Sequence, residues 1–268
     1  MKESLNVAAI QMVSAASLER NLADAGALIA QAADAGAQFV ALPEYFCFMG
    51  KKETDKLVLA ETEGKGPIQD FLSETARRHN IWLSSGSIPL VTPDPGRVFN
   101  TQLIYNPAGE QIARYDKVHL FSFARGQESY DEARSILAGN VPKRVDTPAV
   151  NIGLSICYDL RFPEFYRALG VVDLILVPSA FTYTTGRAHW ETLLRARAIE
   201  NQCYVLAPAQ GGVHENGRRT WGHSMLIDPW GEILSVLPEQ AGVVSGTIEA
   251  SRLLEVRQSL PSLSHRVL

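Results

Sequence analysis

The sequence predicts an α/β fold with mixed sheets, and three observations lead to this fold class. Short runs that are apolar throughout, such as residues 39–42, alternate with amphipathic segments of helical spacing, such as residues 17–35. This alternation is typical of strands covered by helices. Two pairs of strand-like segments joined by turn residues add antiparallel hairpins. No linker, low-complexity tract or repeat divides the chain, so we expect one domain over residues 1–268.

The N-terminal part alternates strand and helix. Its expected elements are strands at residues 5–12, 39–42 and 81–88 and helices at residues 17–35 and 67–79. Ser17 is the expected N-cap of the first helix, because its hydroxyl can accept a hydrogen bond from a free backbone N–H of the first turn. Pro67 suits the first turn of the second helix, where no backbone N–H is needed.

The middle and C-terminal parts combine hairpins with a second strand–helix section. A hairpin is expected from residues 98–105 and 111–115, around the turn Asn106-Pro107-Ala108-Gly109. The second section has strands at residues 150–157, 173–177 and 204–207 and helices from about residue 163 and at residues 188–201. A last hairpin joins residues 224–227 and 232–235. The two strand–helix sections suggest internal pseudo-symmetry.

Composition excludes several classes of protein. Hydrophobic residues make up 46% of the chain and charged residues 20%, which is the balance of a globular protein with a sizeable core. The net charge of −4 is mild and no segment concentrates Lys or Arg, so we expect no nucleic-acid partner. No apolar run is long enough to span a bilayer, and the N-terminus lacks the pattern of a signal peptide, so we expect no membrane partner.

The cysteines indicate a reducing compartment. The chain has three cysteines, an odd number, at Cys47, Cys157 and Cys203. They are far apart in sequence, and none belongs to a Cys-x-x-Cys pair. We therefore expect reduced thiols in a cytoplasmic protein, with neither a disulfide framework nor a structural zinc site. No pair of histidines has ligand spacing, so a zinc hydrolase is a remote alternative.

Three chemically useful side chains follow the ends of expected strands. Cys157 ends the apolar run 150–156, Glu44 follows the strand at residues 39–42, and Lys117 follows the second strand of the first hairpin. Functional groups collect beyond the carboxyl ends of strands in open α/β sheets. A cysteine there can act as a nucleophile if a base and a suitable charge environment accompany it.

The chemistry of these three residues is coherent. A carboxylate among aromatic residues has a raised pKa, so Glu44 could take a proton from a thiol and later give it to a leaving amine. Lys117 and the backbone N–H of Tyr158 could stabilise the oxyanion that forms when Cys157 attacks an amide carbon. Each residue also has a structural alternative, because Glu44 or Lys117 could be solvated and Cys157 could only fill space. Spacing alone does not show that they converge.

Three local motifs resemble the signature segments of the nitrilase superfamily of carbon–nitrogen hydrolases. They are Leu42-Pro43-Glu44, Tyr115-Asp116-Lys117-Val118-His119-Leu120-Phe121 and Cys157-Tyr158-Asp159-Leu160-Arg161-Phe162-Pro163-Glu164. The resemblance extends from Ala8-Ala9-Ile10-Gln11-Met12 to Leu260-Pro261 and so covers nearly the whole chain.

The resemblance implies a four-layer αββα sandwich and a Glu-Lys-Cys triad formed by Glu44, Lys117 and Cys157. It also implies a second glutamate, and Gln127-Glu128-Ser129 matches that segment, so Glu128 is the expected fourth catalytic residue. No metal and no organic cofactor are implied. Members of the superfamily dimerise through the helix after the cysteine, here residues 163–169, so a homodimer or a higher homo-oligomer is expected.

Further segments resemble the deaminated glutathione amidase branch of this superfamily. They include Thr185-Gly186-Arg187-Ala188-His189-Trp190-Glu191 and Trp221-Gly222-His223-Ser224-Met225. Arg161, four residues after the cysteine, could grip a substrate carboxylate, or it could pair with Glu164 or with a carboxylate across a dimer interface. The other expected substrate contacts are Tyr158, Phe181, Thr185 and His189, although His189 could equally be structural.

The resemblance therefore implies an amidase that acts on a small amide bearing a carboxylate, with deaminated glutathione as the favoured substrate. An ω-amidase acting on α-ketoglutaramate is the main alternative, because it shares part of the motif pattern. An N-carbamoyl hydrolase and a nitrilase share the triad as well. A non-catalytic binding protein on the same fold is a remote alternative, since a scaffold would not need all three triad residues.

Overall fold

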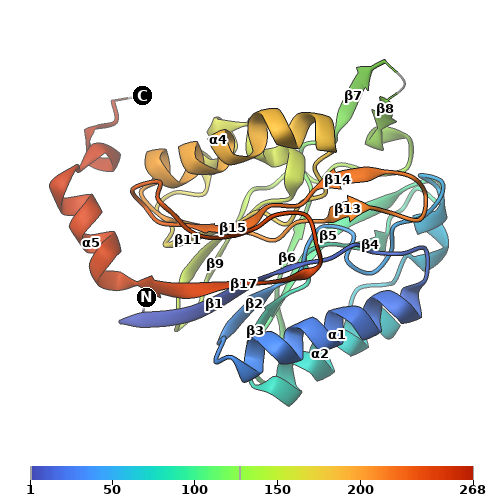
Figure 1. Ribbon diagram of the computed structural model, residues 1–268, viewed down its shortest axis with the longest axis horizontal. Coiled ribbons are helices and arrows are strands. Elements are labelled where there is room, and N and C mark those ends of the chain that lie inside the picture. The colour runs from blue at the N-terminus through green and yellow to red at the C-terminus, as the bar shows by residue number, and fades with distance from the viewer. Residues whose placement is uncertain (1, 127, 268) are drawn as a thin grey trace.

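The computed structural model describes residues 2–126 and 128–267, and it shows two sheets stacked between two layers of helices (Figure 1). In the view of Figure 1, α4 (Tyr183–Asn201) covers the upper side of the stack, and α1 (Leu18–Asp34) and α2 (Pro67–His79) cover the lower side. The predicted α/β class and the four-layer αββα arrangement are confirmed. No helix among the described residues has the length and apolar character needed to cross a membrane.

The first sheet has seven strands of mixed direction. In spatial order they are β17 (Gly242–Glu249), β1 (Ser4–Gln11), β2 (Phe39–Ala41), β3 (Trp82–Ser84), β5 (Val98–Tyr105) and β4 (Ile88–Val91), with β6 (Gln111–Asp116) also paired to β5. Strands β1, β2 and β3 are parallel, and β17 is antiparallel to β1. The predicted β5–β6 hairpin is confirmed as an antiparallel pair.

The second sheet has six strands and repeats part of this plan. Its order is β16 (Ile233–Leu237), β15 (Ser224–Ile227), β12 (Tyr204–Ala207), β11 (Leu174–Leu176), β10 (Asn151–Leu154) and β9 (Lys143–Asp146). Strands β10, β11 and β12 are parallel, whereas β15 and β16 form the predicted second hairpin. Both sheets therefore carry a parallel centre with antiparallel neighbours.

Shorter elements complete the chain. Two separate hairpins are β7 (Ser122–Arg125) with β8 (Glu128–Asp131) and β13 (Gly211–Val213) with β14 (Arg219–Trp221). The remaining helices are α3 (Pro163–Ala168), α5 (Ala250–Ser259) and the 3-10 turns η1 (Asp55–Leu59), η2 (Glu132–Arg134), η3 (Cys157–Arg161) and η4 (Ser262–His265). The β7–β8 hairpin projects at the upper right of Figure 1, and α5 lies on the opposite side beside the N-terminal strand.

The alternation of side chains along β1 explains the stacking. Val7 and Ala9 belong to the apolar core shared by the two sheets, whereas Ala8 and Ile10 belong to the core between the first sheet and helices α1 and α2. Because successive residues of a strand point to opposite faces, a strand that is apolar throughout must be covered on both faces. The sequence of β1 therefore requires a helix layer on one side and a second sheet on the other.

Most expected elements are confirmed, several with bounds shifted by one or two residues, and β10 ends at Leu154 rather than at the expected residue 157. Two further differences concern β3–β4 and α4. The strand expected at residues 81–88 is split into β3 and β4 around Gly86, whose φ is +63°. Helix α4 begins at Tyr183 rather than at residue 188, because the Thr182 hydroxyl caps it by accepting a hydrogen bond from the Thr185 backbone N–H. Ser17 caps α1 as predicted. Both differences lie at loops that face the candidate site.

Candidate active site

Cys157 lies at a sharp turn beyond the carboxyl end of β10. Its φ is +49°, a left-handed conformation that is uncommon for a residue with a side chain. The Cys157 backbone N–H donates to the Pro178 carbonyl at 2.9 Å, and the chain then enters η3. The side chain is 7% exposed, so the sulfur is accessible only from one small cavity. Strained backbone of this kind is typical of functional positions held in place by their surroundings.

Glu44 is the buried carboxylate of this cavity. It follows β2 and Pro43, and its side chain accepts hydrogen bonds from the Asn100 amide at 2.9 Å and from the Ala180 backbone N–H at 2.9 Å. The Lys117 ammonium is its ion-pair partner, at 2.8 Å. Three donors from three different segments therefore fix the orientation of the carboxylate without exposing it to water.

Lys117 is fully buried between two carboxylates. Its Nζ lies 2.8 Å from Glu44 Oε1 and 2.8 Å from Glu132 Oε2, and its backbone N–H donates to the Asn100 carbonyl. Burial alone would lower the pKa of Lys117, but the charges of Glu132 and Glu44 raise it above its ordinary value. The ammonium is therefore charged at neutral pH, as stabilisation of an oxyanion requires.

The glutamate that contacts Lys117 is Glu132, which corrects the expectation that Glu128 takes this place. Glu132 accepts hydrogen bonds from Lys117, from the Tyr45 hydroxyl at 2.7 Å and from the Phe121 backbone N–H at 2.8 Å. Glu128 lies on β8 and accepts a hydrogen bond from the Thr184 hydroxyl at 2.7 Å instead. Its predecessor in the matched segment, Gln127, lies outside the described residues.

The electrostatics keep the Cys157 thiol neutral in the resting site. Burial raises the pKa of Cys157 well above its ordinary value, and the negative charge of Glu44 raises it further. The Lys117 charge and a hydrogen bond from the Ala180 backbone oppose this rise without cancelling it. The thiol therefore needs a base at the moment of attack, and Glu44 lies in the same cavity.

Asp159 connects the turn that carries Cys157 to the segment that carries Lys117. Its buried carboxylate accepts hydrogen bonds from the Tyr115 hydroxyl at 2.6 Å, from the Ile156 backbone N–H at 2.8 Å and from the His119 backbone N–H at 3.0 Å. The His119 ring nitrogen Nδ1 lies 2.8 Å from the same carboxylate. One side chain thus connects the segments of Lys117 and Cys157, two of the three residues expected to form a triad.

The cavity is nearly closed. It contains about 10 Å³ of space for the centre of a water molecule, which is room for about one water. Besides Cys157, five of the eight other expected site residues line it, namely Glu44, Tyr158, Arg161, Phe181 and Thr185. His189 does not line it. That side chain is exposed on α4, with its ring nitrogen 3.2 Å from the Arg161 guanidinium.

Arg161 carries its charge into the cavity without a carboxylate partner among the described residues. The expected alternative, an ion pair with Glu164, is not formed within residues 2–126 and 128–267. The guanidinium lies over the aromatic rings of Tyr158 at 5.6 Å and of Phe181 at 5.3 Å. These contacts orient a cation whose forked donors suit a carboxylate.

Several residues of the site are absent from the sequence-based expectation. They are Tyr45, Asn100, Glu132, Ala180 and Arg218, which hold the catalytic side chains or line the cavity. Ala180 lies in Pro178-Ser179-Ala180-Phe181, a segment that shares the branch resemblance. The other four lie outside the matched motifs, so their sequence signals are weak and only the fold brings them to the site. Within the described part of the chain, no group of three His, Cys, Asp or Glu side chains could hold a metal ion.

Comparison with known sequences identifies one family. The family model described as carbon–nitrogen hydrolase matches residues 6–258. A Synechocystis protein named deaminated glutathione amidase is 45% identical over 266 residues, which cover 97% of this chain and 97% of that protein.

Solved structures agree with the fold. The Caenorhabditis elegans NitFhit protein superposes with a TM-score of 0.91 at 41% identity, over 99% of this chain and 65% of that longer chain. An amidase from Nesterenkonia sp. AN1 has a TM-score of 0.79 at 26% identity, over 96% of this chain and 98% of its own. That structure shows acrylamide added to the cysteine of its active site.

Proposed function

The chain belongs to the carbon–nitrogen hydrolase family, and we propose that it hydrolyses deaminated glutathione through a thioester on Cys157. The observation that carries the proposal is one cavity lined by Cys157, Glu44 and Arg161, with the Lys117 ammonium 2.8 Å from Glu44. Arg161 has no carboxylate partner among the described residues. The name of the Synechocystis relative supports the choice of substrate.

The proposed first step is attack of the Cys157 sulfur on the amide carbon. Glu44 accepts the thiol proton as the carbon–sulfur bond forms, since the raised pKa of Cys157 keeps the thiol protonated until then. The Lys117 ammonium and the Tyr158 backbone N–H stabilise the oxyanion of the tetrahedral intermediate. Glu44 then returns the proton to the leaving nitrogen, the carbon–nitrogen bond breaks, and a thioester remains.

Water completes the proposed cycle. Glu44 takes a proton from a water molecule that attacks the thioester, and the carbon–sulfur bond breaks to release a carboxylic acid and restore the thiol. Glu132 acts as a positioning residue, because it holds the Lys117 ammonium on the side opposite Glu44. On the acyl side of the amide, Arg161 binds the substrate carboxylate with its forked donors.

The proposal also covers the domain organisation, the oligomeric state and the cellular compartment of the protein. We expect one catalytic domain, a homodimer that uses α3 as part of its interface, and residence in the cytoplasm. The three cysteines are free and buried, which suits a reducing compartment. Sedimentation of the purified chain tests the oligomer, and a monomer at micromolar concentration would contradict that part of the proposal.

Steady-state kinetics on a substrate panel test the proposed activity. Deaminated glutathione should give the highest kcat/KM, ahead of α-ketoglutaramate, N-carbamoyl amino acids and aliphatic nitriles. A higher kcat/KM for α-ketoglutaramate would favour the ω-amidase alternative, because that amide has the same acyl part and releases only ammonia. No turnover of any amide would refute the proposed function.

A further inference from the structure

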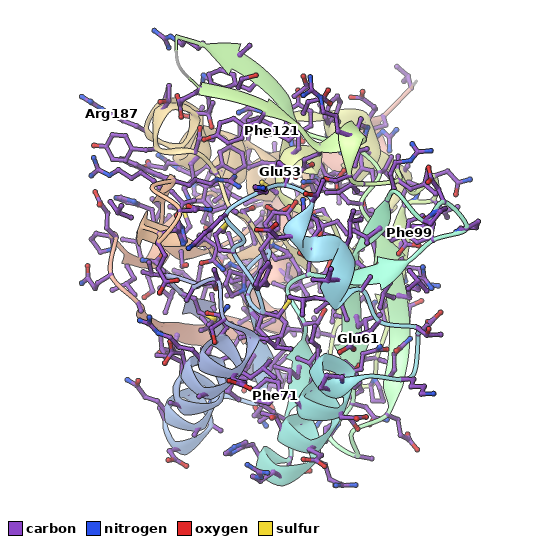
Figure 2. The ribbon with its side chains drawn as sticks, turned by 90° about the vertical axis from the view of Figure 1, so that its right-hand side faces the viewer. Glu53, Glu61, Phe71, Phe99, Phe121 and Arg187 are labelled. Atoms are coloured by element: carbon purple, nitrogen blue, oxygen red, sulfur yellow. The ribbon has the colours of Figure 1, made fainter. Side chains whose placement is uncertain are left out.

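An open cleft adjoins the closed cavity that contains Cys157. The cleft provides about 340 Å³ of space for the centre of a water molecule, far more than the cavity does. Arg218 lines both spaces. Glu53 lines the cleft and Phe121 lines the cavity, and Figure 2 shows Phe121 above Glu53 on one face of the molecule.

Arg218 has an unusual environment for a charged side chain. It lies between β13 and β14, and its Nη2 donates to the Ala180 carbonyl at 3.0 Å while its guanidinium covers the Tyr130 ring at 5.1 Å. Its Nε is buried and has no hydrogen-bond partner. No carboxylate of the described residues lies within ion-pair distance of it. A buried donor on a cation is costly to leave unpaired, so such a group calls for a ligand.

The cleft beyond Arg218 is positively charged, although the whole chain is not. Three lysines line it together with Arg218, against one acidic residue, Glu53. The lysines are Lys51, Lys52 and Lys56. Glu53 is already paired with Lys56 at 2.9 Å. A surface of this sign on a chain of net charge −4 favours an anionic ligand over a neutral one.

We propose that Arg218 and the lysine-lined cleft bind a second carboxylate of the substrate, on the leaving-group side of the scissile amide. The inference rests on the proposed function and adds to it a substrate class, amides with a carboxylate on each side of the bond that is cut. Arg161 lines only the closed cavity and takes the acyl carboxylate, whereas Arg218 stands where the cavity opens.

A leaving group about two residues long can carry a carboxylate beyond the cavity. An extended chain spans at most about 3.6 Å per residue, so a dipeptide reaches about 7 Å from the scissile nitrogen. Deaminated glutathione has such a leaving group, and its terminal carboxylate would meet Arg218 where the cavity adjoins the cleft. The forked guanidinium can bind a carboxylate through two parallel hydrogen bonds.

A matched pair of substrates tests this subsite. The pair is deaminated glutathione and the same molecule with its terminal carboxylate converted to a carboxamide, so that only the distal charge differs. The wild-type enzyme should prefer the carboxylate form by roughly 10- to 100-fold in kcat/KM, mostly through KM, as expected for a charged hydrogen bond at a buried site.

Two variants at the subsite and one control complete the experiment. Arg218→Gln should remove the preference between the two substrates, and Arg218→Lys should retain part of it, since a lysine keeps the charge but lacks the fork. Arg219→Gln makes the same change in charge at the adjacent residue and should keep the full preference for the carboxylate substrate. Arg219 is exposed and pairs with Glu239 at 3.0 Å. Thermal melting of each variant identifies any loss caused by unfolding.

The outcomes separate this proposal from the proposed function. If Arg218 only supports the Ala180 carbonyl, Arg218→Gln lowers kcat/KM for both substrates by the same factor, and the proposal is overturned. Wild-type turnover of both substrates without preference also overturns it and leaves the amidase function intact. No wild-type turnover of either would refute the substrate assignment itself. Loss of the preference in Arg218→Gln alone supports the subsite.

Discussion

The Asp159 carboxylate accepts a 2.6 Å hydrogen bond from the Tyr115 hydroxyl, and this contact joins the strand before Lys117 to the turn after Cys157. The Tyr115 hydroxyl oxygen in turn accepts a hydrogen bond from the Val118 backbone N–H at 3.1 Å. The two sheets thus meet at the active site through a buried polar network rather than through apolar packing alone. A fully satisfied network of this kind fixes one geometry, because each missing bond would be costly.

Asp159→Asn should destabilise the fold by about 2–3 kcal/mol, because it replaces a charged acceptor that serves Ile156, His119 and Tyr115. The amide would also present N–H groups to other donors. Tyr115→Phe removes only one of these bonds and should cost about 1 kcal/mol. Urea denaturation measures both. Equal stability of Asp159→Asn and the wild type would show that the network contributes little.

Cys157→Ala should lower kcat by roughly a thousandfold or more, because it removes the proposed nucleophile. Rapid quench of the wild type with substrate should give a mass increase on the peptide that contains Cys157. Cys203→Ala is the matched control, since Cys203 is fully buried at the start of β12 and lines neither space beside the triad. Amide hydrolysis by Cys157→Ala at the wild-type rate would rule out the thioester mechanism.

Glu132→Gln should lower kcat/KM by roughly 100-fold, because Lys117 would lose one of its two carboxylate partners and shift from its position. Glu128→Gln removes a carboxylate from the same hairpin region but leaves Lys117 untouched, so its loss should be at least about tenfold smaller. Parallel kinetics with one amide compare the two. A larger loss in Glu128→Gln would restore the assignment made from the motif.

Glu132 should also contribute to acid unfolding. Burial tends to raise the pKa of Glu132, but the Lys117 charge and hydrogen bond outweigh it and hold the pKa below its ordinary value. Its stabilising contribution is therefore complete above about pH 4.3, the unfolded value, and is lost as the pH falls through the lower folded value. The free energy of unfolding should fall less steeply with acid in Glu132→Gln. Identical slopes below pH 4 would contradict this.

Gly86→Ala should displace the segment that carries Glu44. An added Cβ would lie 2.1 Å from the Pro43 carbonyl oxygen and 2.5 Å from that of Leu42, where backbone must move. Gly64 has a similar positive φ of +77° but open space around it, so Gly64→Ala measures the conformational cost alone. Gly86→Ala should cost about 1–3 kcal/mol more than Gly64→Ala. Equal melting temperatures of the two variants would show that the loop around Gly86 can move to accommodate the added Cβ at no cost.

The sequence pattern indicated the strands and helices well because apolar alternation depends on local chemistry, whereas the four layers were implied by the resemblance to the superfamily. Strand β12 and helix α2 have the predicted bounds, and β1 shows why two covered faces were required. Positions of loops were harder to predict. The strand expected at residues 81–88 breaks at Gly86, since a glycine in a strand gives no local sign of the conformation it will adopt.

The triad was predicted from strand ends and motif resemblance, whereas its supports were not. The glutamate that contacts Lys117 lies four residues after the one expected from the motif. Along the β7–β8 hairpin, Glu128 lies beside Thr184, and Glu132, just after the hairpin, lies beside Lys117. Both residues are glutamates in similar local sequence, so only the path of the hairpin distinguishes them. Arg218 was missed for the same reason, since its neighbour Ala180 is distant in sequence.

The buried group of two carboxylates, one ammonium and one thiol has a consequence for the chemical step. In the proposed mechanism, the Cys157 proton moves to Glu44, so a neutral acid replaces a carboxylate while the negative charge passes to sulfur and then to oxygen, near Lys117. The sum of charge inside the cavity never changes. The proposed step therefore needs no counterion to enter and little rearrangement of solvent around the reacting atoms.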